Sequence, residues 1–303
     1  MRPEQTRATP TAPTPLFGDL GPGALSATHR RGAAGTSAWR GVARQARQRL
    51  PGLWFGGWLA LALSVPLAVL GWWDDRTLLG VSVWTKPWKF HVSVGLHLLT
   101  LAWFAALLQD TPDRARGFRR MSAVALSCSV IELAYITWRA ARGEASHFNV
   151  GTPLAGAMYA VMGLGAVLLT ACAGWLGWVT LRARDYAWGA VLQRGVGLGP
   201  LMGFVLGTLA GAYVSAQTGH HVGGTASDAQ GLPLFNWSRD GGDLRVAHFF
   251  GLHAMHVLPL VAWWAGRLAS PITARRALDS VALGYAVLTV GSFVQAVLGR
   301  PFL

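Results

Sequence analysis

Residues 53–73 read LWFGGWLALALSVPLAVLGWW, a stretch of 21 residues without one charged side chain. A transmembrane helix needs about 20 mainly apolar residues to cross the hydrocarbon core of a bilayer, so this stretch predicts a membrane-spanning helix. It begins too far from Met1 for a typical secretory signal peptide, and Asp74 and Asp75 follow it directly. We therefore expect it to stay in the protein as a helix.

The composition of the whole chain agrees with this prediction. Of its 303 residues, 52% are hydrophobic and 13% are charged, whereas soluble domains carry about 25% charged residues. The formal net charge of +13 is spread over the first 50 residues and several short loops, where basic residues orient membrane helices and contact anionic lipid. We expect a lipid bilayer as partner and no nucleic acid.

Seven windows are long and apolar enough to span a membrane. They predict an all-α fold, a polytopic transmembrane bundle of seven helices over residues 51–303, with segments at 53–73, 88–108, 122–139, 154–181, 200–217, 246–268 and 280–299. Residues 1–50 are rich in Ala, Thr, Pro, Gly and Arg and predict a disordered basic cytoplasmic tail.

The distribution of Lys and Arg predicts the orientation of the bundle. With the N-terminus inside, 18 of the 26 basic residues lie on the inner side, which favours an N-inside and C-outside topology. An eighth helix over 185–199 would invert half of this arrangement.

Small residues recur every four positions along the fifth predicted helix, which allows another helix to approach closely. They are Gly199, Gly203, Gly207 and Gly211, followed by Ser215 and Gly219. The pattern indicates either tight packing inside the bundle or a homodimer formed through this glycine face.

Ionisable side chains fall at one depth in three predicted helices, about 10 to 16 Å beneath the outer boundary. Glu132 is the one acidic residue within any predicted segment. Neutral imidazole and carboxylate groups are ligands for Zn, Fe or Cu, and a functional role is the default for such groups in a bilayer. The predicted metal ligands are His97, Glu132, His253 and His256. The alternative is that these side chains only hydrogen-bond between helices.

A second polar layer is predicted at the outer boundary, including a Gly-rich loop over 218–245. Its residues would bind a cofactor or an anionic small molecule, with haem propionates among the candidates. They are Lys86, Lys89, Arg139, Arg142, His147, His221, Asp243, Arg245 and His248. For the two lysines, snorkelling beside tryptophan is the alternative, and for the loop it is disorder.

Four blocks resemble segments of uncharacterised bacterial multi-pass membrane proteins. They are KPWKF at 86–90, RGEASHFN at 142–149, TGHHVGG at 218–224 and GGDLRVAHFFGLHAMHVLPL at 241–260. The resemblance covers most of residues 84–303 and implies the bacterial inner (plasma) membrane, but no activity.

Ser93 and His97 are also similar to the Ser-x-x-x-His of the seven-helix zinc hydrolases of the progestin and adiponectin receptor type. That family's His-x-x-x-His on the last helix is absent here, and its metal lies toward the cytoplasmic side. The similarity is therefore an analogy only.

Three functional hypotheses follow. The first is a membrane metal or haem b protein, an oxidoreductase or a metal-dependent hydrolase, with Glu132 as a ligand or as a catalytic general base on bound water. The second is a carrier for an ion or small anion, in which Glu132 and the histidines relay protons. The third is a structural or assembly subunit. The chain has no convincing internal repeat, which favours the first hypothesis over the second.

Overall fold

The structure is a computed structural model that describes residues 28–109, 111–184 and 186–303. Eight helices dominate these residues: α1 Thr28–Arg49, α2 Pro51–Trp73, α3 Thr85–Ala106, α4 Pro112–Ala141, α5 Pro153–Arg182, α6 Ala190–Ser215, α7 Arg245–Leu268 and α8 Pro271–Val297. Two small antiparallel hairpins complete them: β1 Thr77–Leu78 with β2 Val81–Ser82, and β3 His221–Val222 with β4 Gly242–Asp243. The predicted all-α class is confirmed.

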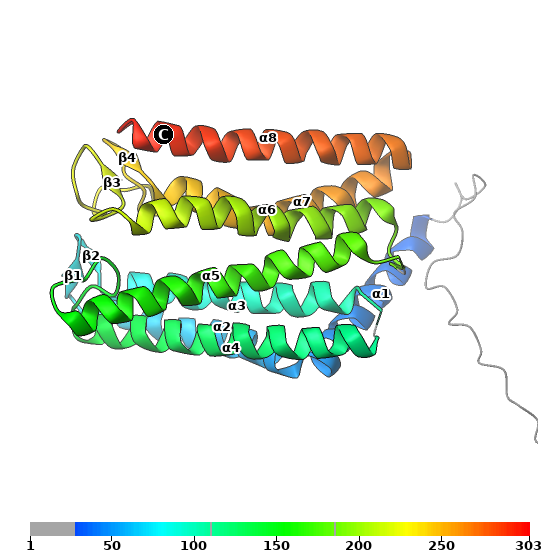
Figure 1. Ribbon diagram of the computed structural model, residues 1–303, viewed down its shortest axis with the longest axis horizontal. Helices are drawn as coiled ribbons and strands as arrows, with labels where there is room; N and C mark the ends of the chain where they lie inside the picture. The colour runs from blue at the N-terminus through cyan, green and yellow to red at the C-terminus, as the bar shows by residue number, and fades with distance from the viewer. Residues whose placement is uncertain (1–27, 110, 185) are drawn as a thin grey trace, which may run out of the picture.

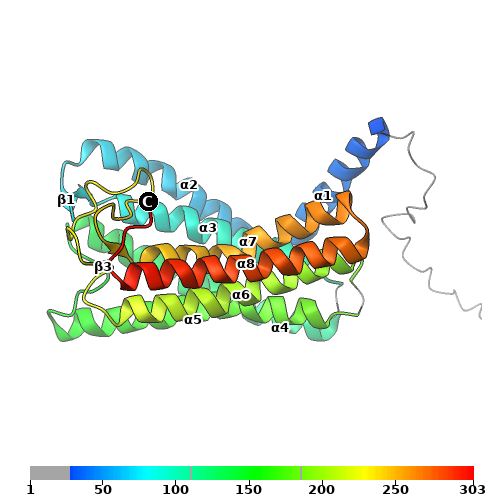
Figure 2. The ribbon, with the colours of Figure 1, turned by 90° about the horizontal axis from the view of Figure 1, so that it is seen from above.

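Helices α2 to α8 lie side by side along the longest axis of the molecule, and both hairpins lie at one end of this bundle (Figure 1). We call this the hairpin end. Helix α1 lies at the opposite end and leaves the bundle at an angle (Figure 2). All of the longer polar loops that carry candidate site residues therefore gather at the hairpin end.

Six of the described helices are long and apolar enough to cross a membrane, namely α2 and α4 to α8. Each of the seven predicted segments coincides with one of the helices α2 to α8, but α3 is not among the six. Its sequence includes Lys86, Lys89, His91 and His97, which lower its mean hydropathy. The predicted count of seven spans is therefore not supported by length and composition.

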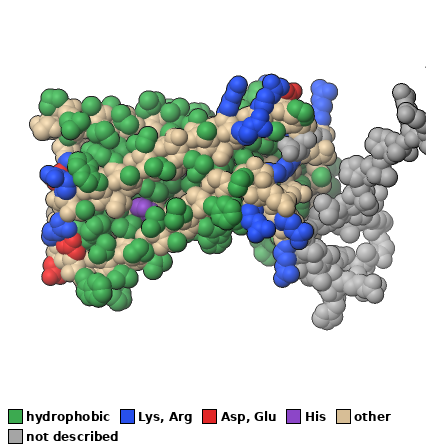
Figure 3. Space-filling view, turned by 90° about the horizontal axis from the view of Figure 1, so that it is seen from below, with side chains coloured by type: hydrophobic (Ala, Val, Ile, Leu, Met, Phe, Trp, Pro, Cys, Tyr) green, Lys and Arg blue, Asp and Glu red, His purple; other side chains and the backbone are tan. Residues whose placement is uncertain are grey.

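The surface of the bundle has the character of a lipid-facing surface. Large apolar side chains such as Val65 of α2, Leu164 of α5 and Leu283 of α8 are more than 60% exposed. Hydrophobic side chains cover the middle of the molecule, while Lys and Arg gather at its ends (Figure 3). Such a band is suited to a bilayer and not to water. The chain is an integral, multi-pass membrane protein.

Three of the helices begin with the same local signal. Thr111, Thr152 and Ser270 each stand before a proline, and each side-chain oxygen accepts a hydrogen bond from a backbone N–H in the first turn. A hydroxyl N-cap followed by proline satisfies the free donors of a helix start. These caps fix where α4, α5 and α8 begin.

The glycine face of α6 is covered by α7 of the same chain. A Cβ atom on Gly199 would come within 2.9 Å of the Ala254 carbonyl oxygen, and one on Gly251 within 2.6 Å of the Gly207 nitrogen. The backbones of α6 and α7 therefore touch, as in other membrane helix pairs with small residues. The stripe serves packing inside the bundle, so the structure does not support a homodimer through this face.

Two further predictions concern chain segments near helix ends. Helix α6 runs without a break from Ala190 through Pro200, so residues 190–199 belong to it and do not form a separate helix. Residues 28–49 of the predicted tail form α1, whose Val42 and Ala46 are buried against the bundle. The tail itself stays a prediction for residues 1–27, which lie outside the described part of the chain.

Candidate metal centre

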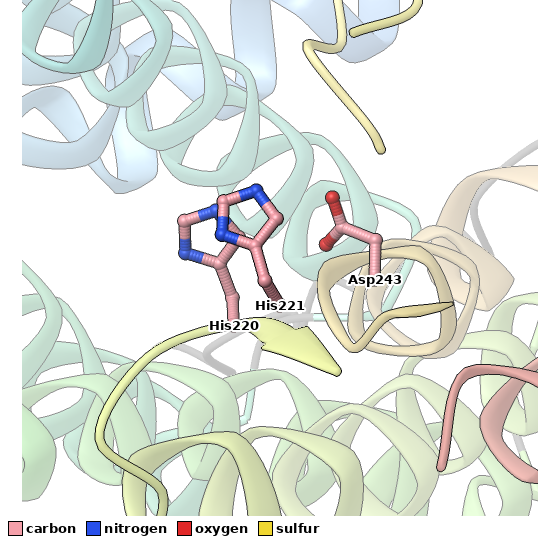
Figure 4. A group of neighbouring side chains, drawn as sticks. All are labelled: His220, His221 and Asp243. Carbon is pink, nitrogen blue, oxygen red and sulfur yellow. The ribbon is translucent and has the colours of Figure 1, made fainter. Parts of the chain in front are cut away.

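The loop between α6 and α7 folds over the hairpin end and brings two adjacent histidines to a carboxylate. Strand β3 pairs with β4 so that His221 lies opposite Asp243, and the Leu244 N–H donates to the His220 carbonyl oxygen at 3.0 Å. The two imidazole rings lie next to each other, with centroids 4.0 Å apart. The Asp243 side chain lies across from them (Figure 4).

The donor atoms of this group have the spacing of ligands to one metal ion. One ligand atom from each of His220, His221 and Asp243 lies within 4.8 Å of the other two. Asp228 lies beside this group, with its Oδ1 atom 3.2 Å from His220 Nε2 and 3.5 Å from His221 Nε2. Ligands of a tetrahedral zinc ion at about 2.0–2.1 Å are about 3.3 Å apart. We call these four residues the cap cluster.

The first hairpin holds Asp228 in place. The Asp228 N–H donates to the Leu79 carbonyl oxygen at 2.8 Å, and the Ser227 hydroxyl donates to the same oxygen at 3.2 Å. Leu79 and the following Gly80 both have a positive φ, as the tight turn between β1 and β2 requires. Residues separated by about 150 positions in the sequence therefore build one wall of the cap cluster.

Arg245, the first residue of α7, joins the two carboxylates. Its Nη2 atom lies 2.7 Å from Asp228 Oδ1 and 2.6 Å from Asp243 Oδ2, and its Nε atom donates to Asp243 Oδ1 at 2.9 Å. The ammonium groups of Lys86 and Lys89 also act on Asp228, and Lys89 acts on Asp243 as well. The two carboxylates are therefore held among several cationic side chains.

The protonation states also suit a metal ion. Burial acts to raise the pKa of Asp228, but the hydrogen bond with His220, the nearby His221 ring and the charge of Arg245 hold it well below its usual range. Burial likewise acts to raise the pKa of Asp243, and hydrogen bonding to Arg245 outweighs it. Burial lowers the pKa of His220, although its contact with Asp228 acts in the other direction. Ionised carboxylates and a neutral imidazole are the forms that bind a metal.

One donor in the cap cluster has no partner. His221 Nε2 is buried, and although Asp228 Oδ1 is 3.5 Å away, the two atoms make no hydrogen bond. Buried polar atoms without a partner are rare in folded proteins, and a missing ion is one explanation. The geometry, the donor chemistry and this atom together fit a transition-metal ion.

The four predicted deep ligands do not come together in this way. His97 Nε2 lies 3.3 Å from the Leu169 carbonyl oxygen, and His256 Nε2 lies 3.3 Å from the Thr100 hydroxyl. Within the described residues, no three of His97, Glu132, His253 and His256 bring ligand atoms within 4.8 Å. Two of these histidines instead bond between helices, as the alternative for the deep layer expects, and one ion bound by all four residues finds no support.

The predicted outer layer divides into two parts. His221, Asp243 and Arg245 meet at the cap cluster. Other members have partners within the protein. Arg139 and Arg142 pair with Glu144, and Lys89 donates to the Phe235 carbonyl oxygen and to Asn236 Oδ1. His147 forms a hydrogen bond with Ser146, and His248 forms one with the Gly207 carbonyl oxygen. Lys86 lies over the Phe90 ring at 5.8 Å. In the described part of the chain nothing supports the predicted haem.

His220 and Asp228 belong to the cap cluster but are absent from the predicted site. The sequence signal for His220 is the adjacent pair of histidines in the block TGHHVGG. Asp228 has no such signal, because its position depends on a contact with the distant β1–β2 turn.

No protein-family model, curated protein or solved structure matches this chain. The resemblance noted in the sequence is therefore supported only as far as a multi-pass helical membrane protein.

Proposed function

We propose that this chain is a membrane metalloprotein that binds one divalent transition-metal ion, zinc above all, through His220, His221 and Asp243, with Asp228 as a fourth donor. The observation that carries the proposal is the convergence of one donor atom each from His220, His221 and Asp243 within 4.8 Å of one another. Two imidazoles and carboxylate oxygens are a donor set that zinc prefers.

The surrounding residues define what the site would do with an ion. If three side chains bind it, one coordination position is open to an oxygen ligand, which a bound zinc ion would polarise as a Lewis acid. Arg245 binds both carboxylates and partly neutralises them, so it would compete with the ion for their negative charge.

We further propose that the hairpin end faces the outside of a bacterial inner membrane, with α3 as a seventh traversal and the topology N-inside and C-outside. Two observations support this orientation. In the described part of the chain, 16 of the 24 basic residues fall on the α1 side, and the cap cluster lies at the opposite end of the bundle (Figure 1). The cap cluster would then take its ion from outside the cell.

The test uses the full chain purified in detergent, with metal content measured by elemental analysis and zinc affinity by competition with a chromogenic chelator. We expect one zinc ion per chain. His220→Gln and Asp243→Asn remove ligands, so each should lower the affinity by more than the roughly 10- to 100-fold that the loss of a partner outside the ligand set costs.

The matched control is His253→Gln, since His253 lies on α7 outside the cap cluster. It should bind zinc as the wild type does. If His97→Gln or His256→Gln loses zinc and His220→Gln keeps it, the metal site lies in the deep layer and not in the cap cluster. If the chain binds no zinc at all, the proposal is refuted.

A further inference from the structure

Glu132 differs from every other acidic residue on the six candidate membrane helices. Asp113 and Asp279 are 88% and 40% exposed at the side chain, and each pairs with an arginine. Glu132 is only 4% exposed and its Oε1 atom makes no hydrogen bond. A buried carboxylate without a partner is unstable as an anion by several kcal/mol.

A second unpartnered polar atom lies one helical turn before Glu132. Ser129 on α4 is 3% exposed, and its hydroxyl also has no hydrogen-bond partner. On α5, a Cβ atom added to Gly165 would come within 3.4 Å of Glu132 Oε1, so the α5 backbone closes over the carboxyl group. Two such atoms on one turn indicate a small polar species that the protein binds here.

The helices around Glu132 offer very little charge. Helix α2 has no ionisable side chain, and α5 contributes Tyr159 and Cys172 before its final arginine. Within two turns of Glu132, α4 contributes Cys128, Tyr135 and Arg139, and Arg139 is paired with Glu144. Among the ionisable residues of α3, Lys86 is the cation that acts on Glu132, but it does not form an ion pair with it. The carboxyl group is therefore most stable as the neutral acid.

Lys86 also connects Glu132 to the hairpin end. A small pocket there is lined in part by Lys86, Ile136, Glu144 and Ser146. Ile136 is one turn of α4 beyond Glu132. The pocket therefore reaches to within one helical turn of the buried acid, and Lys86, which lines the pocket, also acts on Glu132.

We infer that Glu132 is a proton-binding site inside the membrane, loaded from the hairpin end past Lys86. The ligand is a single proton, carried by the carboxyl group and released when a change in its surroundings makes the anion stable. This site is separate from the cap cluster, and it does not depend on a metal.

Dicyclohexylcarbodiimide tests this directly on the full chain in detergent. The acid proton moves to a carbodiimide nitrogen, the carboxyl oxygen bonds to the central carbon, and the adduct rearranges to a stable N-acylurea that peptide mass spectrometry locates. We expect labelling of Glu132 at neutral pH, declining as the pH rises, and no labelling of the paired Asp279.

Variants keep the test independent of folding. Glu132→Gln resembles the neutral acid, so it should lose the label and keep the wild-type melting temperature. Removing the Lys86 charge in Lys86→Met should shift the decline to higher pH, because that charge favours the ionised carboxylate. His220→Gln should label as the wild type does, which separates this site from the metal centre.

Three results would overturn the inference. The first is an unlabelled Glu132 at neutral pH. The second is a large loss of stability in Glu132→Gln, which would mean that the carboxylate is ionised and paired. The third is protection of Glu132 by Na⁺ at constant pH, which would make it a sodium site.

Discussion

Replacing Arg245 by Gln should destabilise the metal-free protein more than any other single charge removal at the hairpin end. Arg245 Nη2 contacts Asp228 Oδ1 at 2.7 Å, Asp243 Oδ2 at 2.6 Å and the Asn236 carbonyl oxygen at 2.5 Å. The substitution keeps a polar side chain but removes the charge between the two carboxylates.

The magnitude follows from the geometry of the cap cluster. Because one nitrogen touches both carboxylates, their oxygens lie roughly 5 Å apart, and at an effective dielectric constant of about 20 two unit charges at that distance repel by about 3 kcal/mol. Breaking a buried ion pair costs about 3–5 kcal/mol. The Arg245 side chain is 27% exposed, so we take the lower value, about 3 kcal/mol of unfolding free energy.

The assay can use the two buried cysteines, Cys128 and Cys172, which react with a fluorogenic maleimide only when the bundle opens. Melting is measured once in the presence of a chelator and once with zinc at about 100 times its dissociation constant. Zinc at that concentration should raise the free energy of unfolding by about 2.7 kcal/mol. The control is Arg76→Gln, whose ion pair with Asp74 at the same end is half exposed on the arginine side and should contribute less than about 1 kcal/mol. Equal melting of wild type and Arg245→Gln in chelator, or no effect of zinc on the variant, would refute the reasoning.

Three further predictions concern pH, packing and topology. Burial, with the charges of Lys86 and His248, lowers the pKa of His147 to about 3, so its contribution to stability is present above about pH 6.5 and is lost as the pH falls toward 3; melting of His147→Gln should depend less on pH over this range. Gly251→Ala should cost about 1–3 kcal/mol because the new Cβ meets the Gly207 backbone, whereas Gly291→Ala on α8 meets open space and should melt like the wild type. Reporter fusions should place the loop 218–244 outside and the loop 269–270 in the cytoplasm, and the reverse result would contradict the proposed orientation.

The helices could be predicted from sequence because an apolar window of membrane length has few other stable structures. The ends of the helices could not be predicted, since a hydropathy window detects only the apolar part of each helix. Helix α4 was predicted over 122–139, yet it begins at Pro112 because Thr111 caps it and three polar turns precede the apolar part. Helix α6 begins ten residues before Pro200, since a proline can lie within a membrane helix when neighbouring helices satisfy the backbone.

The candidate site could be predicted only in part for a different reason. Helical periodicity indicates which side chains share a face, and it placed His97 and His256 toward the bundle interior, where they bond to neighbouring helices. It contains no information on the loop 218–244, whose fold depends on the pairing of His221 with Asp243 and on the contact of Asp228 with Leu79. Those contacts join distant parts of the chain, so no local pattern shows that His220 and Asp228 lie together.

A metal centre and a simple ion-pair network predict different effects of removing Arg245 on zinc affinity and on stability. Arg245 and a bound ion would use the same two carboxylates, so each must weaken the binding of the other, and this coupling is reciprocal. Removing the guanidinium should therefore lower the stability of the metal-free chain and raise its zinc affinity. If the four residues form only an ion-pair network, removing Arg245 should disorder the loop. Both the stability of the chain and its zinc affinity should then fall. Measuring zinc affinity and melting temperature on the same Arg245→Gln preparation distinguishes the two, and a joint decrease would leave the cap cluster as a structural clamp on α7.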